Sequence, residues 1–410
     1  MNVSRFRAGQ SAKAAAAAAA LVLMMSGCGG DSAGSGSDGE EPYRILVLGA
    51  LSAEGVLGIN ASTSVLSAEA AVDVINDEGG ILGRDVEVKV VDDQADPTTA
   101  VTLVREAINS DTPPDAILNS GPSTVAEATL PIIAQAGIVS FNIGPTETSW
   151  DPGAFPHNFD IAVGPQDVAG GVVTYFEEQG YKSAAVLHGS SSYGEAFGAE
   201  SESSLEDAGV KVLGNEEYDV ASLDMTPQLE ALRAKDPEVL VLDAYGAPLG
   251  YVLQGIEKLG WDVPIVGNTS VSATGLVNTP PPGGVMGTDQ VKNLVMQVFH
   301  STVADPAAAE TNRAVEAMLA KGDIKATLIL AFNYDAVVLL KAAVESVGSA
   351  EDADAVTAAL ENPEVTRSAP TAMLSEYVFS DKRHAAVIPG TEFRFIPPSG
   401  IKDGQFHLGD

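Results

Sequence analysis

The sequence predicts an alternating α/β fold, in which helices and strands follow one another along the chain. The stretch from residue 65 to residue 97 shows the pattern most clearly. Four apolar residues recur at the three- and four-residue spacing of one helix face: Val65, Ala68, Val72 and Ile75. Gly79 and Gly80 follow directly, where a left-handed residue ends a helix at little steric cost. Three valines then alternate with charged residues at the period of a strand: Val86, Val88 and Val90.

Similar units continue along the chain. Short apolar runs predict strands at 44–48, 86–91, 116–119, 138–141, 184–188, 211–213, 239–243 and 265–266. Helical spacing appears between them, for example at Val101, Val104 and Ile108, and a long helix is predicted over 328–347. Strands that alternate with helices form parallel sheets with right-handed crossovers. Breaks near 157–165 and in the Pro/Gly-rich stretch 278–287 divide the units into two lobes.

Two motifs in the first unit extend this prediction. They are Gly79-Gly80-x-x-Gly83-Arg84 and Asp92-Asp93-x-x-Asp96-Pro97. In this arrangement the chain resembles the leucine/isoleucine/valine-binding family of periplasmic solute-binding proteins. The resemblance implies the type I periplasmic binding protein fold, with two doubly wound Rossmann-like lobes joined by a three-stranded hinge. It also implies interleaved lobes, with lobe 1 at 43–162 and 290–375 and lobe 2 at 163–289 and 376–410.

The N-terminus indicates export. Arg5, Arg7 and Lys13 precede an apolar stretch at 14–25, which has the length of a signal-peptide core and is too short to span a bilayer. Met25-Ser26-Gly27-Cys28 follows and resembles a bacterial lipoprotein signal. We therefore expect a signal peptide at 1–27, lipidation of Cys28, and a flexible linker at 28–42. The alternative is an ordinary signal peptide with an incidental cysteine.

Charge and cysteine content restrict the possible partners. The chain has 22 basic and 56 acidic residues, a formal net charge of −34. Such a charge argues against nucleic acid and against binding to anionic membrane surfaces, so a lipid anchor is the expected membrane contact. The single cysteine excludes an intramolecular disulfide, which a chain of this length does not need for stability.

No catalytic or metal-binding motif stands out. The five histidines are scattered, at positions 157, 188, 300, 384 and 407, without the spacing of metal ligands. Nucleophile-elbow and phosphate-loop motifs are absent from the sequence. We therefore predict a binding protein with no cofactor and no metal, and not an enzyme.

Candidate ligand residues in the first lobe follow two predicted strands. Ligands of open α/β sheets bind at the carboxyl ends of strands. Ser123 and Thr124 open a helix, whose free N–H groups suit a carboxylate, with Ser123 as the expected N-cap. The resemblance implies that they bind the ligand carboxylate; the alternative is that Ser123 only caps its helix. The next loop offers Ile143, Gly144 and Thr146, where Thr146 matches a ligand-binding threonine of the family; the alternative is a plain turn.

In the second lobe, two tyrosines match cleft aromatics of the family: Tyr193 and Tyr245. A tyrosine there offers apolar area with one polar tip, although core packing beside a loop is the alternative. Amino-acid-binding relatives carry an acidic residue where this chain has Thr269 or Ser270, in a stretch without a carboxylate. Asp243 is a nearby substitute for pairing with a ligand ammonium; otherwise the ligand is a carboxylate or amide without one.

These observations predict an extracytoplasmic, lipid-anchored substrate-binding protein of an ABC importer of the branched-chain amino acid type. The lobes would close over a small polar ligand, and the closed form would dock on a permease that works with ATPase subunits. The alternative from another class is a ligand-sensing receptor module with the same fold.

Overall fold

The computed structural model describes residues 41–386, 388 and 390–408, which contain two large, separate sheets whose strands are mostly parallel. The first sheet has the order β2-β1-β3-β4-β5, with every pair parallel. Its strands are β1 (Tyr43–Gly49), β2 (Val86–Asp92), β3 (Ala116–Asn119), β4 (Val139–Asn142) and β5 (Asn158–Asp160). The first four lie where the sequence predicts them. β5 was not predicted, because three residues carry no readable periodicity.

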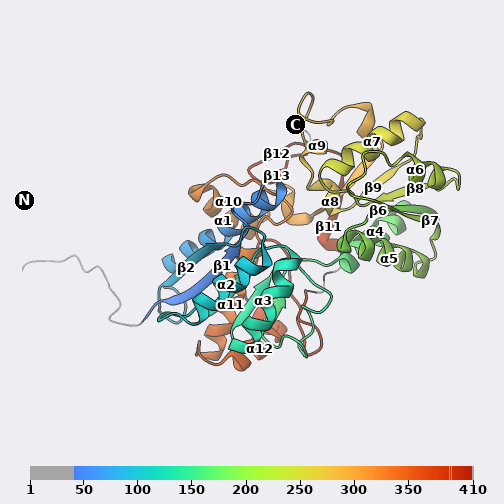
Figure 1. The fold of residues 1–410 in the computed structure, drawn as a ribbon. Coiled ribbons are helices and arrows are strands. Elements are labelled where there is room, and N and C mark those ends of the chain that lie inside the picture. The colour runs from blue at the N-terminus through green and yellow to red at the C-terminus, as the bar shows by residue number, and fades with distance from the viewer. Residues whose placement is uncertain (1–40, 387, 389, 409–410) are drawn as a thin grey trace, which may run out of the picture. The chain divides into compact units, whose positions relative to one another are not determined.

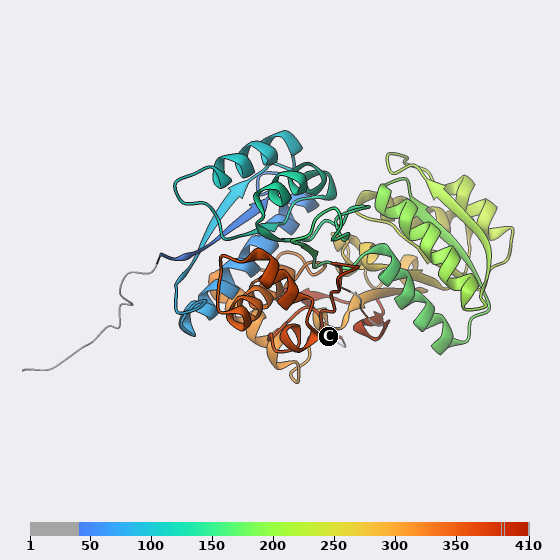
Figure 2. The same cartoon turned by 90° about the horizontal axis from the view of Figure 1, so that it is seen from below.

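Helices cover both faces of this sheet. They are α1 (Val56–Asp77), α2 (Pro97–Ile108), α3 (Ser123–Ala136), α10 (Ala309–Lys321), α11 (Phe332–Val347), α12 (Ala353–Leu360) and α13 (Pro363–Thr366). Ile45 and Val47 of β1 face the core formed with α1 and α11, whereas Leu46 and Leu48 face α2 and α3. Alternate residues of a strand point to opposite faces, so a strand buried on both sides is apolar throughout. Figures 1 and 2 show α10 and α11 beside α1, far from it in sequence.

The second sheet has the order β11-β10-β9-β8-β6-β7, and only the β10–β11 pair is antiparallel. Its strands are β6 (Ser183–Gly189), β7 (Lys211–Tyr218), β8 (Val239–Leu242), β9 (Ile265–Gly267), β10 (Leu294–Phe299) and β11 (Phe393–Ile396). The helices of this part are α4 (Pro165–Gln179), α5 (Ser192–Asp207), α6 (Thr226–Arg233), α7 (Ala247–Leu259), α8 (Thr269–Ser272) and α9 (Gly275–Asn278). The predicted strands 184–188, 211–213, 239–243 and 265–266 correspond to β6 to β9.

The interleaving of the two sheets differs from the expected boundaries by about one element. The range 290–375 was assigned to lobe 1, but β10 within it pairs with β9 and β11 of the second sheet. The range 376–410 was assigned to lobe 2, but Phe379 packs its ring against Phe159 of β5, 4.9 Å between centroids. The chain therefore passes between the sheets after β5, after β10, and between Ala386 and β11.

A short hairpin and three 3₁₀ helices complete the described fold. A hairpin of β12 (Ile401–Lys402) and β13 (Gln405–Phe406) ends it, and Val303 forms an isolated bridge with Phe406. Three single-turn 3₁₀ helices lie at η1 (Asp289–Val291), η2 (His300–Thr302) and η3 (Gly390–Glu392).

A buried carboxylate holds the segment that leads to the last crossing. Asp335 of α11 accepts hydrogen bonds from the backbone N–H groups of Ala372 and Met373, at 2.6 and 2.9 Å, and from the Tyr377 hydroxyl at 2.7 Å. Burial raises the pKa of Asp335 to about 7, and these hydrogen bonds oppose that rise. The carboxylate thus replaces the backbone partners that an irregular segment lacks.

The strand order indicates where a ligand would bind. In each sheet the order reverses once, between β1 and β3 in the first and between β6 and β8 in the second. Connections leave these strands toward opposite faces, which opens a crevice at their carboxyl ends. The loops that follow β1, β3, β6 and β8 are therefore the parts of the scaffold to examine for a site.

Candidate functional site

The loop after β3 presents the N-terminus of α3. Ser120 is fixed at the strand end, because its N–H donates to the Leu48 carbonyl and its hydroxyl accepts from Asn333 Nδ2 at 2.7 Å. The helix begins at Ser123, and Pro122 occupies the N-cap position without a side-chain cap. The prediction that Ser123 is the N-cap is therefore wrong by one residue. Ser123 is half-buried and Thr124 is exposed, in a first turn whose leading N–H groups have no intrahelical partner.

The loop after β4 lies directly against this helix start. A Cβ atom built on Gly144 would come within 2.8 Å of the Ser123 nitrogen and of the Gly121 carbonyl oxygen. No side chain fits at that distance, so the close approach of the two backbones depends on glycine at position 144. The structure thus brings Ser123 and Thr124 together with the loop that carries Ile143, Gly144 and Thr146.

Thr146 is tied into its own loop. Its hydroxyl oxygen accepts from the backbone N–H groups of Ser149 at 3.0 Å and Thr148 at 3.3 Å. Its own N–H donates to Ser149 Oγ at 2.8 Å, and Ser149 Oγ donates to Asp160 Oδ2 at 2.6 Å. Burial raises the pKa of Asp160 to about 6, while the hydrogen bonds from Ser149, Asn142 and Asn158 oppose the rise. Sequence reasoning missed Ser149 and Asp160, because their roles depend on contacts between β5 and a loop 11 residues earlier.

In the second sheet, Tyr193 stands in the first turn of α5. Ser191 caps that helix by accepting from the Gly194 N–H at 3.0 Å. The helix start approaches the end of β6 closely, since a Cβ on Gly194 would lie 2.2 Å from the Gly189 carbonyl oxygen. Burial raises the pKa of Tyr193 far above its usual value, and the neighbouring Asp243 raises it further, so the phenol remains a neutral hydrogen-bonding group.

Asp243 lies beneath this helix start. Its side chain is only 4% exposed, and Oδ1 accepts from Asn268 Nδ2 at 2.8 Å. Oδ2 lies 3.1 Å from the position that a Cβ on Gly194 would take. Burial raises the pKa of Asp243, and the hydrogen bond from Asn268 opposes the rise. The carboxylate therefore already has protein partners and is covered by the α5 backbone.

Thr269 and Tyr245 flank Asp243 in different ways. Thr269 is the first residue of α8, only 4% exposed, and follows Asn268, whose side-chain oxygen caps the Ser270 and Val271 N–H groups. Tyr245 is half-buried and its hydroxyl accepts from Asn60 Nδ2 of α1 at 3.3 Å. Asn60 was missed because nothing in its local sequence marks a contact 185 residues away. The structure thus places Tyr193, Asp243 and Thr269 in one cluster and joins Tyr245 to the first sheet.

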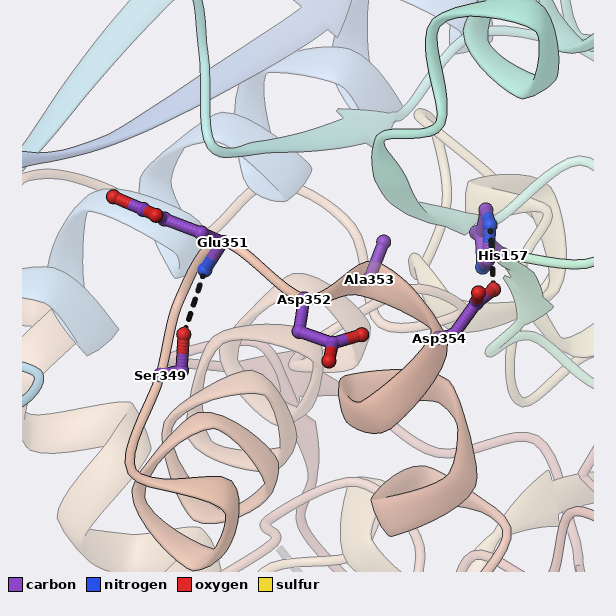
Figure 3. A pocket seen from close by; sticks show the side chains of 6 residues that line it. All are labelled: His157, Ser349, Glu351, Asp352, Ala353 and Asp354. Atoms are coloured by element: carbon purple, nitrogen blue, oxygen red, sulfur yellow. Dashed lines mark hydrogen bonds and ion pairs between the residues drawn. The ribbon is translucent and has the colours of Figure 1, made fainter.

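A hollow among the described residues lies elsewhere. It has a volume of about 460 Å³ and is lined by His157 and the start of α12. Figure 3 shows His157 pointing toward Asp354, at 3.5 Å between Nε2 and Oδ1. His157 Nδ1 also pairs with Thr357 Oγ1 at 2.9 Å. This hollow is not at the carboxyl ends of strands, and within the described ranges no group of three potential metal ligands is arranged to hold an ion.

The predicted signal peptide, the predicted linker up to residue 40 and Cys28, the expected lipidation residue, lie outside the described residues. Between Glu41 and Leu408, none of the described helices combines the length and the apolar character that crossing a bilayer requires.

Two doubly wound sheets, each with a switch point in its strand order, define the class of type I periplasmic binding proteins. The comparisons agree. A family model described as "Periplasmic binding protein" matches residues 42–393, and the chain belongs to this family. Its curated relatives place it with the branched-chain amino acid group, a family of solute-binding and receptor proteins that works outside the cytoplasm.

Individual relatives are distant. The chain is 25% identical over 301 residues to "Leu/Ile/Val-binding protein BraC3" of Rhizobium johnstonii, covering 72% of this chain and 77% of the relative. It is 22% identical over 286 residues to the leucine-, isoleucine-, valine-, threonine-, and alanine-binding protein of Pseudomonas aeruginosa, covering 68% and 72%. A periplasmic binding protein type 1 from Bordetella pertussis shares the fold, with a TM-score of 0.69, 20% identity and coverage of 88% and 98%.

Proposed function

We propose that this protein is the substrate-binding lipoprotein of an ABC importer of the branched-chain amino acid type. It captures a small polar ligand between its two lobes and delivers it to a permease that works with ATPase subunits. The ligand is an amino acid, or a carboxylate or amide that lacks an ammonium group. Relatives whose names state that they bind leucine, isoleucine and valine support this role.

The observation that carries the proposal is the contact between the two loops of the first sheet. Gly144 lets the loop of Thr146 lie on the start of α3, a helix of 14 residues. This contact brings the free N–H groups and the positive end of the helix dipole, with the hydroxyl of Ser123 in the first turn, next to the loop that carries Thr146. Such an arrangement favours a carboxylate. Tyr193 and Tyr245 supply apolar area with polar tips from the second sheet.

The proposal is tested by binding to the purified protein. Calorimetry with leucine, valine, phenylalanine, 4-methyl-2-oxopentanoate and benzoate should identify at least one ligand. The double variant Ser123→Ala/Thr146→Val removes two donors to a charged group, each worth about 1.5–3 kcal/mol, so affinity should fall by at least roughly tenfold. Thr102→Ala, which is exposed on α2, is the control and should bind like wild type. An unchanged dissociation constant in the double variant would show that the ligand does not bind at Ser123 and Thr146.

The lipid anchor has its own test. A lipidated Cys28 would carry a diacyl group and an amide-linked chain. Because a single acyl chain binds a membrane only marginally, this set of chains would hold the protein firmly. Cys28→Ser should leave an unprocessed precursor or release the protein from membranes. Normal processing and retention of that variant would contradict the lipoprotein assignment.

Import and sensing make different predictions for the same binding protein. An importer component stimulates uptake of the bound ligand by membranes that contain its permease, and deletion of the protein abolishes that uptake. A receptor module leaves uptake unchanged and alters a signalling output instead. Uptake of the calorimetrically identified ligand in a deletion strain separates the two.

A further inference from the structure

The hydroxyl of Thr146 has a fixed hydrogen-bonding direction. A threonine oxygen has two lone pairs and one proton. Both lone pairs are engaged, since the oxygen accepts from the N–H groups of Ser149 at 3.0 Å and Thr148 at 3.3 Å. The proton is then the one part of the hydroxyl left for a ligand. Thr146 can therefore donate to a ligand atom but is poorly able to accept from one.

Ser149, which is buried, helps to keep the hydroxyl oxygen of Thr146 occupied as an acceptor. It lies at 0% exposure, and its N–H is one of the two donors that occupy the Thr146 oxygen. In return its Oγ accepts from the Thr146 N–H at 2.8 Å. Ser149 Oγ also makes a longer contact with the Thr146 carbonyl oxygen, at 3.4 Å, so three hydrogen bonds link the two residues across the turn.

Asp160 on β5 fixes Ser149 in turn. Its side chain is 1% exposed, and Oδ2 accepts from Ser149 Oγ at 2.6 Å. Oδ1 accepts from Asn142 Nδ2 at 2.8 Å, and Asn142 also bonds both the N–H and the carbonyl of Gly144. A single carboxylate therefore holds the loop at its start, through Asn142, and at its end, through Ser149.

We infer that Asp160 and Ser149 are positioning residues for ligand recognition, which fix Thr146 as a one-way hydrogen-bond donor. This corner of the site then selects an acceptor group, a carboxylate or carbonyl oxygen, and rejects a donor group in the same place. The inference rests on the proposed function, because it assumes that the ligand contacts Thr146. It adds two residues that do not touch the ligand but determine which chemical group the site accepts.

The experiment compares Ser149→Ala, Thr146→Val and the double variant, using the tightest binder among leucine, valine, phenylalanine, 4-methyl-2-oxopentanoate and benzoate. Each single variant should weaken binding roughly tenfold, the value of one hydrogen bond to a charged group. Because Ser149 acts through Thr146, the double variant should bind within about threefold of Thr146→Val alone. Ser149→Cys, which retains a weak donor and acceptor, should recover part of the affinity.

Ser140→Ala is the matched control for a purely structural role. Ser140 is 1% exposed on β4 and donates to Asn158 Oδ1 at 2.9 Å in the same buried network, without contacting Thr146. It should lose stability comparable to Ser149→Ala, while its affinity stays within about twofold of wild type.

Several results would overturn the inference. Multiplicative effects in the double variant would show that Ser149 acts independently of Thr146. Equal loss of affinity in Ser140→Ala and Ser149→Ala would show that the buried network affects binding only through the stability of the fold. If Ser149→Ala does not fold, Ser149→Gly, which also lacks the hydroxyl, replaces it in the same cycle, and wild-type affinity in that variant counts against the inference. Ligand binding that survives Thr146→Val defeats the inference but leaves the solute-binding role intact, whereas a wild-type protein that binds none of the five probes defeats both.

Discussion

The two halves of the candidate site rest on buried aspartates that are used differently. In the first sheet, Asp160 supports a loop through Asn142 and Ser149, and Thr146 lies above it with its proton free. In the second sheet, Asp243 lies directly under the start of α5 and pairs with Asn268. The first half thus separates the charge from the ligand loop by a layer of neutral groups. In the second half, only the backbone at the start of α5 covers the carboxylate of Asp243.

Acidification is expected to have the largest effect, because it acts on both of these aspartates and on Asp335. Burial raises the pKa of Asp160 to about 6 and that of Asp335 to about 7, and it also raises the pKa of Asp243. Between about pH 4 and pH 7 the native state therefore binds more protons than the unfolded state, so stability decreases as pH rises through this window. Each unit of pKa displacement corresponds to about 1.4 kcal/mol.

Urea denaturation from about pH 7 to about pH 5 measures this effect, and the free energy of unfolding should increase by an amount of order 1 kcal/mol or more. The comparison should be made at high salt, which screens the repulsion among surface acids. Asp160→Asn should show a smaller gain. A free energy of unfolding that falls on acidification would contradict the assignment of these groups as buried and destabilising when charged.

The second prediction compares the two close-packed glycines. Gly194→Ala places a Cβ 2.2 Å from the Gly189 carbonyl oxygen, and Gly144→Ala places one 2.8 Å from Gly121 and Ser123 backbone atoms. Overpacking of this kind costs about 1–3 kcal/mol, with Gly194→Ala the more severe. Gly170→Ala, in a helix with open space around the new Cβ, is the control and should not destabilise. Thermal denaturation of the three variants ranks their stabilities. A Gly144→Ala variant with unchanged stability and affinity would contradict the close contact between the first-sheet loops.

The third prediction concerns Asp243 and the ligand. Asparagine keeps an oxygen that can accept from Asn268, so Asp243→Asn should change the free energy of unfolding by less than about 1 kcal/mol at neutral pH. If the ligand lacks an ammonium group, its affinity should change little. If the ligand is an amino acid, affinity should fall by more than roughly tenfold, because a buried ammonium would lose its anionic partner. Tight leucine binding that survives Asp243→Asn would contradict both branches.

The smallest expected effect concerns the contact between Tyr245 and Asn60, which joins the loop after β8 to the first helix, α1, at 3.3 Å. Tyr245→Phe removes one neutral hydrogen bond and keeps the ring, so affinity should fall by about two- to fivefold, equivalent to about 0.5–1 kcal/mol. Asn60→Ala should give a similar change, and the two should not add in the double variant. Additive losses would show that the two side chains act separately.

The sequence predicts the scaffold better than the site, for a physical reason. Strands buried on both faces, such as β8, are continuous apolar runs, and helix faces repeat regularly, so both are visible locally. The loops containing Ser123, Thr146 and Tyr193 could be located because they follow such strands. Asp160, Ser149 and Asn60 could not, because each acts through a partner on another element, and no local pattern encodes that partner. Ser123 was misassigned as an N-cap for a related reason, since Pro122 already has the extended backbone that the position requires.

The loop that ends with Ser149 also carries Trp150. This side chain is 40% exposed, its ring nitrogen donates to the Glu147 carbonyl at 2.8 Å, and its own carbonyl accepts from the His384 N–H. The chain has only one other tryptophan, Trp261, which is partly buried against the apolar core of the second sheet. The protein thus contains its own optical probe, in which emission from Trp150 reports on the environment of the Thr146 loop and Trp261 serves as an internal reference. Removing Trp261 would leave a single-tryptophan protein whose fluorescence follows ligand capture without any attached dye.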